Sequence, residues 1–194
     1  MSLDTKIITD CKKGKAYAQD KIYDLYSGAM LGICARYAAN IAEAEDILQE
    51  SFIKVFIKIS KYDFTSVASF SAWIKKIVVN TALNYIRDNK KHKIFDEIDD
   101  KVEMHIQEQE QEEPNINISQ KEILELIQNL PDGYKIVFNL YVFEKYTHQD
   151  IATELDISVN TSKTQLFKAR KLLQTRVLER INKKEKNIVS SVWI

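Results

Sequence analysis

Glycine and proline are scarce in this chain, with four glycines and two prolines among 194 residues. These two residues make most of the tight turns that join short strands, so their scarcity argues against a sheet-rich fold with many turns. Apolar residues account for 45% of the chain, which is enough to build ordinary helical cores. The sequence therefore predicts an all-α protein.

Charge is segregated along the chain, although Lys+Arg and Asp+Glu both number 28. Residues 71–93 carry six bases against one acid, and residues 158–186 carry nine bases against two acids. Between them, residues 94–113 carry nine acids against one base. This acidic stretch has weak periodicity, a Gln/Glu run and a proline at 114, which are features of a flexible linker that repels itself and stays extended. A poorly amphipathic surface helix over part of the stretch is the alternative.

The charge pattern divides the chain into two small helical domains joined by an acidic flexible linker. We expect a first domain at residues 1–93, a linker at 94–118, a second domain at 119–182 and a tail at 183–194. No apolar run approaches the roughly 20 residues of a membrane span, and the N-terminus lacks the apolar stretch of a signal peptide. We therefore expect the chain in the cytoplasm, without insertion into a membrane.

Few residues suggest catalysis or metal binding. Cys11 and Cys34 have neither metal-ligand spacing nor a secretory context, so we expect no disulfide, no metal and no cofactor. Glu45, Asp46 and Glu50 are close in sequence, but helical spacing turns Glu45 about 100° away from Asp46, and no histidine is near. We therefore predict that the protein is not an enzyme.

The helix predicted over residues 42–60 has two distinct faces. One face is apolar and is expected in the core, with Ala44, Leu48, Phe52, Val55 and Ile59. The opposite face mixes acidic, amide and aliphatic residues, namely Asp46, Gln49, Glu50, Ile53 and Ile57. An apolar centre rimmed by charge is typical of a surface that docks another protein. Alternatively, Ile53 and Ile57 could be buried against a third helix of the same bundle.

Two neighbouring segments are also predicted to be helical. The helix over 15–37 should place these residues in the core: Ile22, Leu25, Tyr26, Ala29 and Ile33. After a polar loop at 63–68, Ser69 is a plausible N-cap for a helix with these core residues: Phe70, Ile74, Ile77 and Thr81. Another side of that helix carries Ser69, Trp73, Lys76, Asn80, Asn84 and Arg87. Two amides between two bases beside an aromatic ring suit a nucleic acid, although a solvated face with Trp73 in the core is the alternative.

The second domain reads as four helices, with a break at Leu130-Pro131 and N-caps at Thr147 and Ser158. The third and fourth helices have the spacing of a helix-turn-helix, whose second helix lies in the major groove of DNA. On the fourth helix, these residues should point inward: Ser162, Leu166, Ala169 and Leu173. The side chains expected to contact DNA are Thr147, Ser158, Asn160, Thr161, Lys163, Thr164, Lys168 and Lys171. Phe167 also points outward.

Together the two halves resemble one family. The segments AEAEDILQESFIKVF and SFSAWIKKIVVNTALNYIRDNKK, an acidic stretch, and LPDGYKIVFNLYVFEKYTHQDIATELDISVNTSKTQLFKARKLL follow one another. They resemble the extracytoplasmic-function group of the sigma-70 family, the small two-domain sigma factors of bacterial RNA polymerase. The resemblance covers about residues 15–93 and 119–178, and it is specific because two unrelated motifs keep the order and spacing of the family.

The resemblance implies recruitment of RNA polymerase core to promoters. The mixed face of residues 42–60 would dock on the clamp helices of the largest polymerase subunit. The helix-turn-helix would read a minus-35 element as duplex. A melted minus-10 element, including one flipped base, would be recognised by these residues: Phe64, Ser66, Ser69, Trp73, Lys76, Asn80, Asn84 and Arg87. The implied partners are polymerase core, promoter DNA and an anti-sigma protein, often membrane-bound, and the free protein would be a monomer.

Two departures and two rival functions accompany the resemblance. Glu43 stands where the family more often has aspartate, and Ser162 stands where an inward valine is common, so the last helix would pack more loosely. A dimeric helix-turn-helix repressor or activator would explain the second domain but leave the mixed face of the first unused. A metal-dependent DNA-processing enzyme using Asp46 and Glu50 would lack a second ligand cluster.

Overall fold

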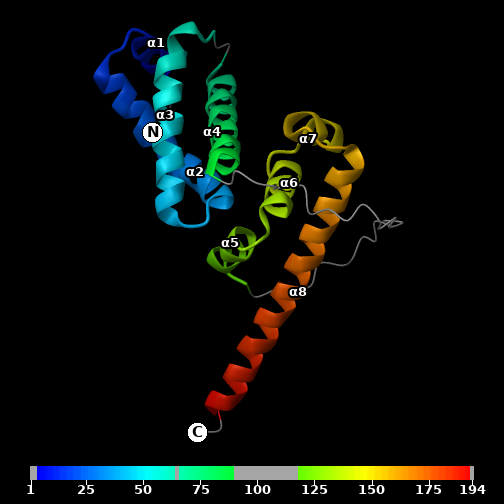
Figure 1. The fold of residues 1–194 in the computed structure, drawn as a ribbon. Helices are drawn as coiled ribbons and strands as arrows, with labels where there is room; N and C mark the ends of the chain where they lie inside the picture. Colours follow the sequence, from blue (N-terminus) through cyan, green and yellow to red (C-terminus); the bar gives the residue numbers. More distant parts are fainter. Residues whose placement is uncertain (1–3, 64–65, 90–117, 193–194) are drawn as a thin grey trace. The chain divides into compact units, whose positions relative to one another are not determined.

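The computed structural model describes residues 4–63, 66–89 and 118–192. The chain divides into two compact units, Met1–Lys91 and His92–Ile194. All regular structure in the described residues is helical, which confirms the predicted all-α class (Figure 1). The predicted linker at 94–118 lies outside the described residues except for its last residue. No described helix combines the length and the apolar character needed to cross a membrane.

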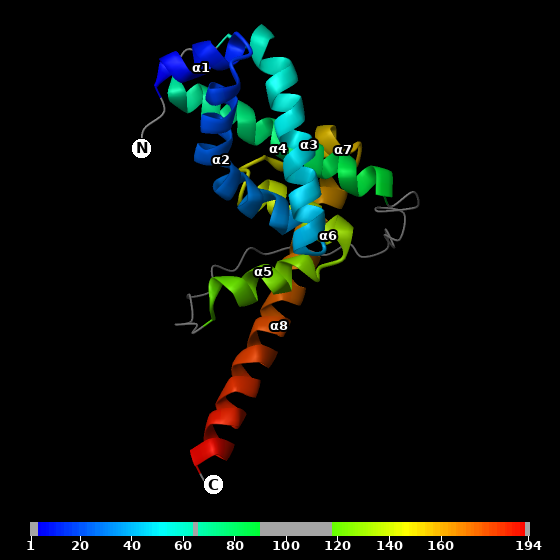
Figure 2. The same ribbon diagram turned by 90° about the vertical axis from the view of Figure 1, so that its left-hand side faces the viewer.

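The first unit is built from helices α1 to α4 and a short 3-10 helix, η1. Their bounds are α1 Thr5–Lys12, α2 Ala16–Tyr37, α3 Ile41–Lys58, η1 Ile59–Lys61 and α4 Val67–Asn89. Helices α2, α3 and α4 pack against one another, and α1 contacts α2 and η1 at one end of the group (Figures 1 and 2). The starts of α1 and α3 are capped, because Asp4 accepts from the amide of Lys6 and Asn40 from that of Glu43, at 3.0 and 2.9 Å.

The core of the first unit follows the predicted faces of α3 and α4. The predicted core residues of α3 and η1 are all at most 4% exposed: Ala44, Leu48, Phe52, Val55 and Ile59. Phe70, Ile74 and Thr81 of α4 are buried as predicted, whereas Ile77 is half-buried. Burying one large apolar side chain of this kind stabilises the fold by about 2 kcal/mol. These two faces therefore hold α3 and α4 in a fixed orientation.

The buried face of α2 differs from the predicted one. Ile22 and Ile33 are buried, Leu25 and Tyr26 are half-buried, and Ala29 is exposed. Toward its C-terminal end α2 buries these residues: Met30, Ile33, Cys34, Ala35 and Tyr37. Because α2 contacts α1, α3 and α4, its buried positions spread around the helix instead of following one stripe. The prediction of a single core face was wrong for this reason.

The second unit is organised around one long helix. Its elements are α5 Gln120–Gln128, α6 Asp132–Val142, α7 His148–Leu155 and α8 Val159–Val192. Helices α5, α6 and α7 each pack against α8, and residues 183–192 continue this helix (Figure 1). Arg180 lies 3.0 Å from the carboxylate of Glu125, and Arg176 donates to the carbonyl of Asn129 at 2.9 Å. These contacts tie α5 to the middle of α8.

Candidate functional site

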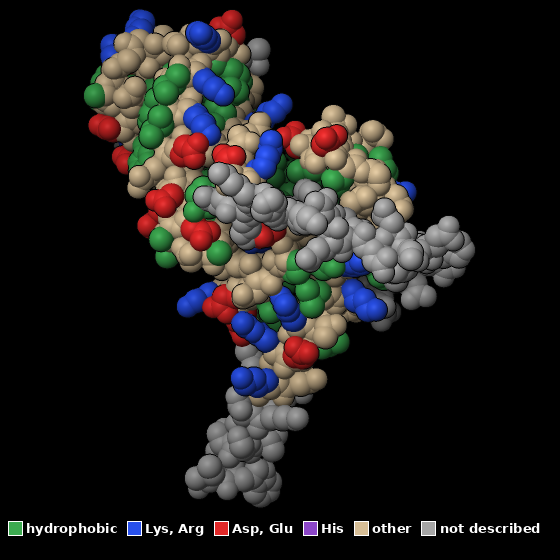
Figure 3. All heavy atoms as spheres, in the orientation of Figure 1, with side chains coloured by type: hydrophobic (Ala, Val, Ile, Leu, Met, Phe, Trp, Pro, Cys, Tyr) green, Lys and Arg blue, Asp and Glu red, His purple; other side chains and the backbone are tan. Residues whose placement is uncertain are grey.

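The mixed face predicted for residues 42–60 lies on the outer side of α3. We call it the α3 strip, and it consists of Asp46, Gln49, Glu50, Ile53 and Ile57, all exposed. Ile53 and Ile57 are 59% and 69% exposed. No other helix of the described first unit covers them, so the alternative of burial within this bundle is wrong. Figure 3 shows hydrophobic side chains together with acidic ones over α3.

One acid of the α3 strip has a local partner. Glu50 pairs with Lys54 one turn later at 2.6 Å, and Lys54 also lies 3.4 Å from the hydroxyl of Thr81 on α4. Half of the Glu50 side chain is exposed, so solvent screens the pair and its contribution to stability is small. Part of the charge of Glu50 is therefore compensated within the first unit.

Helix α4 begins three residues earlier than predicted. Ser66, not Ser69, is its cap, because the hydroxyl of Ser66 accepts from the amide of Ser69 at 3.1 Å. The amide of Ser66 donates back to the hydroxyl of Ser69 at 3.1 Å, so the two serines bond reciprocally. Both side chains lie at the surface, with Ser66 exposed and Ser69 half-buried. Phe64 lies outside the described residues.

The polar side chains predicted along α4 form a surface that we call the α4 strip, consisting of Trp73, Lys76, Asn80, Asn84 and Arg87. Lys76, Asn84 and Arg87 are exposed. Asn80 is half-buried, and its Oδ1 atom is inaccessible to solvent, so only part of its amide could meet DNA. The α4 strip thus presents two cations and one full amide on a single helix.

Trp73 is packed more closely than the rest of the α4 strip. Its ring stacks on that of Tyr62, with centroids 4.4 Å apart and an angle of 20° between the planes, and it is half-buried. The hydroxyl of Tyr62 donates to the carbonyl of Ser69 at 3.1 Å. Sequence reasoning missed Tyr62, which lies between η1 and α4 and so belongs to no periodic pattern. One face of Trp73 is therefore covered by a second aromatic ring.

Helix α7 begins at the predicted cap. The hydroxyl of Thr147 accepts from the amide of Asp150 at 3.1 Å, and the carboxylate of Asp150 accepts from the amide and hydroxyl of Thr147 at 2.9 and 2.6 Å. These hydrogen bonds to its charged form hold the pKa of Asp150 below its ordinary value of 3.8. Helix α7 ends at Asp156, whose φ of +53° is the left-handed conformation that aspartate tolerates.

The first turn of α8 is capped as predicted. The hydroxyl of Ser158 accepts from the amide of Thr161 at 2.9 Å and lies 2.8 Å from the hydroxyl of Thr161. These two predicted DNA contacts are therefore engaged in the cap. Residues 156–158 form the tight turn between α7 and α8 that the helix-turn-helix pattern requires.

The inner and outer faces of α8 follow the prediction closely. Ser162, Leu166 and Ala169 are at most 4% exposed, whereas Leu173 is half-buried. On the outer face Asn160, Lys163 and Lys171 are exposed, and these are half-buried: Thr164, Phe167 and Lys168. Hydrogen-bonding side chains thus lie at the start of α8, and bases are exposed along it, as a DNA-reading helix requires.

A chain of contacts joins α6, α7 and α8 behind this outer face. The imidazole Nδ1 of His148 lies 2.9 Å from the hydroxyl of Ser162. The His148 ring stacks on Tyr141 of α6, with centroids 4.7 Å apart, and the guanidinium of Arg170 lies 5.6 Å from the centre of the Tyr141 ring. Sequence reasoning expected looser packing at Ser162, but its hydroxyl is bonded to His148.

The described residues offer little for metal chemistry. Within residues 4–63, 66–89 and 118–192 no three His, Cys, Asp or Glu side chains gather in a way that could hold a metal ion. Cys11 and Cys34 are buried free thiols, and burial raises their pKa to about 11 and about 12. Burial therefore keeps both cysteines in the neutral thiol form at neutral pH, and neither is available as a thiolate nucleophile.

Two family models match this chain. Sigma-70 region 2 matches residues 22–92, which include the α3 and α4 strips, and sigma-70 region 4 matches residues 120–173, which include the helix-turn-helix. Both matches fall on the surfaces that the sequence motifs predicted, one in each unit.

Full-length relatives and a solved structure agree with these matches. The sigma-E factor of Haemophilus influenzae is 26% identical over 90% of this chain and 95% of its own length. The sigma factor SigW of Bacillus subtilis is 29% identical over 89% of this chain and 95% of its own length. Sigma factor RpoE of Bartonella quintana, solved in complex with the anti-sigma factor NepR, shares the fold with a TM-score of 0.50 and 17% identity, over 82% of this chain and 96% of that chain. The chain therefore belongs to the extracytoplasmic-function group of the sigma-70 family of RNA polymerase sigma factors.

Proposed function

We propose that this protein recruits RNA polymerase core to promoters through three surfaces on its two units: the α3 strip for polymerase, the α4 strip with its cap for a melted minus-10 element, and the outer face of α8 for a duplex minus-35 element. It catalyses no reaction itself, and it acts in the cytoplasm together with the polymerase. The observation that carries the proposal is the exposed pair Ile53 and Ile57 beside the acids of α3, because a helix-turn-helix regulator would have no use for it.

The α3 strip has the composition of a protein interface. Two aliphatic side chains at its centre offer apolar area whose burial would be favourable, at roughly 25 cal/mol per Å² removed from water. The acids Glu50 and Asp46 lie one and two turns before Ile53, respectively, and would steer a basic partner into register. A polymerase surface with apolar and basic side chains fits this pattern.

The α4 strip suits separated DNA strands better than duplex. Lys76 and Arg87 supply positive charge for the backbone, and the amide of Asn84 can bond to an exposed base edge. Unstacking a base costs a few kcal/mol, so contacts available only to extruded bases both offset this cost and select sequence. The Tyr62–Trp73 pair lies at the start of this surface and provides an aromatic boundary.

The outer face of α8 suits the major groove. Asn160 and Lys163 lie in its first two turns, where the second helix of a helix-turn-helix meets base edges. Lys171 is exposed further along, where it can bind phosphate. Because both units belong to one chain, binding by one makes binding by the other intramolecular, so two weak DNA contacts combine into one strong contact.

An anti-sigma protein that covers the same surfaces is part of this proposal. The exposed Ile53 and Ile57 offer apolar area to an inhibitor as readily as to polymerase. Such an inhibitor would compete with polymerase core for the α3 strip. Competition binding between the isolated inhibitor, once identified by co-purification, and polymerase core would test this arrangement.

Binding to polymerase core tests the proposal through the α3 strip. We expect the double variant Ile53→Ser/Ile57→Ser to lose at least about tenfold in affinity for sigma-free core, because two anchors of an apolar interface are removed. The variant Ile41→Ser is the matched control, since Ile41 is 58% exposed on the same helix but lies off the α3 strip. Equal affinities for the double variant and the control would refute the assignment of the strip.

A further inference from the structure

Helix α1 contacts the segment that precedes α4. Lys12, the last residue of α1, donates from Nζ to the carbonyl of Tyr62 at 2.7 Å. The same ammonium lies 3.4 Å from the carboxylate of Asp63, whose side chain is fully exposed, so that ion pair is screened by solvent. The hydrogen bond to the Tyr62 carbonyl is shorter than the contact with Asp63, and it is part-buried, whereas the contact with Asp63 is exposed.

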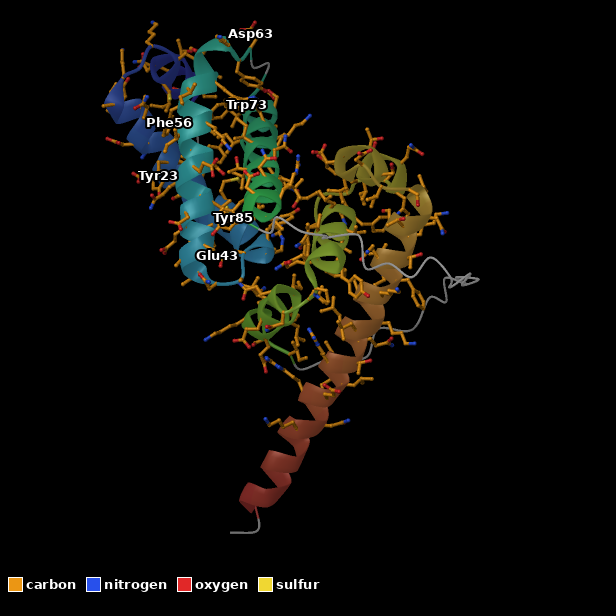
Figure 4. The ribbon with its side chains drawn as sticks, in the orientation of Figure 1. Tyr23, Glu43, Phe56, Asp63, Trp73 and Tyr85 are labelled. Atoms are coloured by element: carbon orange, nitrogen blue, oxygen red, sulfur yellow. The ribbon has the colours of Figure 1, made fainter. Side chains whose placement is uncertain are left out.

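Tyr62 connects this hydrogen bond to the start of α4. Its ring stacks on Trp73, and its hydroxyl donates to the carbonyl of Ser69, which bonds reciprocally with the cap Ser66. Figure 4 shows Asp63 on the segment after η1 and Trp73 on the nearby first half of α4. A displacement of the Tyr62 backbone would therefore move the aromatic pair and the first turn of α4.

Helix α1 provides a firm base for this contact. Ile8 and Cys11 are at most 1% exposed. Asp10 is buried and pairs with Lys15 at 2.8 Å, and it also accepts a hydrogen bond from the hydroxyl of Tyr17. These contacts hold α1 on α2, so Lys12 acts from a fixed position. Helix α1 precedes residue 22, where the match to sigma-70 region 2 begins.

We propose that Lys12 is a positioning residue for the minus-10 site, because its hydrogen bond to the Tyr62 carbonyl holds the Tyr62–Trp73 pair and the capped start of α4 in place for the melted strand. This inference rests on the proposed function of the α4 strip. Lys12 itself need not touch DNA. A carbonyl accepts more strongly from an ammonium than from a neutral donor, so one side chain is sufficient to fix the segment.

The variant Lys12→Met tests this role. Methionine keeps the apolar stem of lysine and removes the donor. The matched control is Lys13→Met, because Lys13 is the exposed neighbour of Lys12. With full-length protein bound to polymerase core, we expect Lys12→Met to bind a single-stranded oligonucleotide from a wild-type minus-10 region about tenfold more weakly, as for one lost charge-assisted hydrogen bond. Affinity for core and for minus-35 duplex should be unchanged, and Lys12→Arg should recover part of the single-strand binding.

A spectroscopic measurement follows the aromatic pair directly. In a Trp193→Phe background the remaining tryptophan is Trp73. Lys12→Met should shift its emission to longer wavelength as the stack with Tyr62 loosens and water gains access, whereas Lys13→Met should not.

Two results would overturn the inference: unchanged single-strand binding by Lys12→Met, or equal losses of core binding and single-strand binding, which would indicate general unfolding. Failure of the wild-type protein to direct any transcription would refute the proposed function instead. In that case the fluorescence comparison would still show whether Lys12 holds the Tyr62–Trp73 pair.

Discussion

The hydrogen bond between His148 and Ser162 sets the contact between the two helices of the helix-turn-helix, and its strength can be measured by a double-mutant cycle. Ser162 is fully buried, and its hydroxyl lies 2.9 Å from Nδ1 of His148. Ser162→Ala removes the hydroxyl, and His148→Phe removes the ring nitrogen while keeping a ring to stack on Tyr141. Each single variant leaves one polar atom of the pair without its partner.

The expected magnitude follows from burial. A neutral hydrogen bond contributes about 1 kcal/mol net, and a buried polar atom left without a partner costs roughly 1–3 kcal/mol. Because Ser162 is fully buried and His148 only half-buried, we expect His148→Phe to destabilise the second unit by about 2 kcal/mol and Ser162→Ala by about 1 kcal/mol. The double variant should cost less than the sum, with a coupling energy of about 1 kcal/mol. Contacts of His148 with other groups cancel in the coupling energy.

Native-state hydrogen exchange is the suitable assay because it reports on one unit within the intact chain. The slowest amides of α8 near Leu166 and Ala169 should report global opening of the second unit. Amides of the first unit should keep their exchange rates in all variants and serve as the internal control. A coupling energy near zero would show that the two side chains do not stabilise each other, and the account of the α7–α8 contact would be wrong.

Three further predictions concern DNA binding, the thiols and acid stability. Lys171→Ala should weaken binding to all duplexes alike and lower the slope of log affinity against log salt by about one, whereas Asn160→Ala should change the preference at one base position. Fluorescence anisotropy over a salt series and over a set of duplexes would measure both effects. A sequence-dependent loss with Lys171→Ala and a uniform loss with Asn160→Ala would contradict these roles. The pKa values of Cys11 and Cys34 are raised to about 11 and about 12, so both thiols should resist alkylation by iodoacetamide at pH 8 in the folded protein and should react in urea. Fast labelling of the folded chain would contradict their burial. The pKa of Asp150 lies below 3.8 in the folded state. The ionised carboxylate therefore stabilises the folded state fully above the pKa of the unfolded state, and this stabilisation is lost as the pH falls through the pKa of the folded state. The difference in stability between wild type and Asp150→Asn, measured by urea unfolding, should stay constant above about pH 5 and shrink in stronger acid; a difference that persisted to pH 2 would contradict this.

Local signals in the sequence predicted much of the second unit. Thr147 and Ser158 are caps followed three residues later by hydrogen-bonding partners, and such motifs act within one turn of chain. The inward positions of α8 followed from helical periodicity alone, because one side of this helix packs on α6 and α7. Ser69 was the wrong cap because Ser66 and Ser69 bond reciprocally, and the sequence does not show which serine precedes the helix.

Tertiary packing, which helical periodicity does not reveal, determines which faces of α2 and α3 are buried. The period of α3 separated its two faces, but it did not show whether another helix covers Ile53 and Ile57, which are exposed. The face of α2 was misjudged because three neighbouring helices bury it from different sides, as the exposed Ala29 shows. A single stripe is a good description only of a helix with one packed side.

Contacts between distant residues were beyond local reasoning. Lys12 and Tyr62 are 50 positions apart, and His148 and Ser162 are 14 apart. Neither pair belongs to a shared helix, so no helical period relates their positions. Both pairs nevertheless lie next to predicted DNA-binding residues, Lys12 and Tyr62 near the start of α4 and His148 and Ser162 near the start of α8.

Transcription in vitro with mapped RNA 5′ ends tests the central claim most directly. Purified protein would be added to sigma-free polymerase core on genomic fragments, alongside Ile53→Ser/Ile57→Ser and the control Ile41→Ser. We predict discrete start sites that share minus-10 and minus-35 sequences, that vanish with the double variant and that persist with the control. Absence of transcripts above core alone, together with specific duplex binding by a dimer of the free protein, would contradict the account and favour a dimeric regulator.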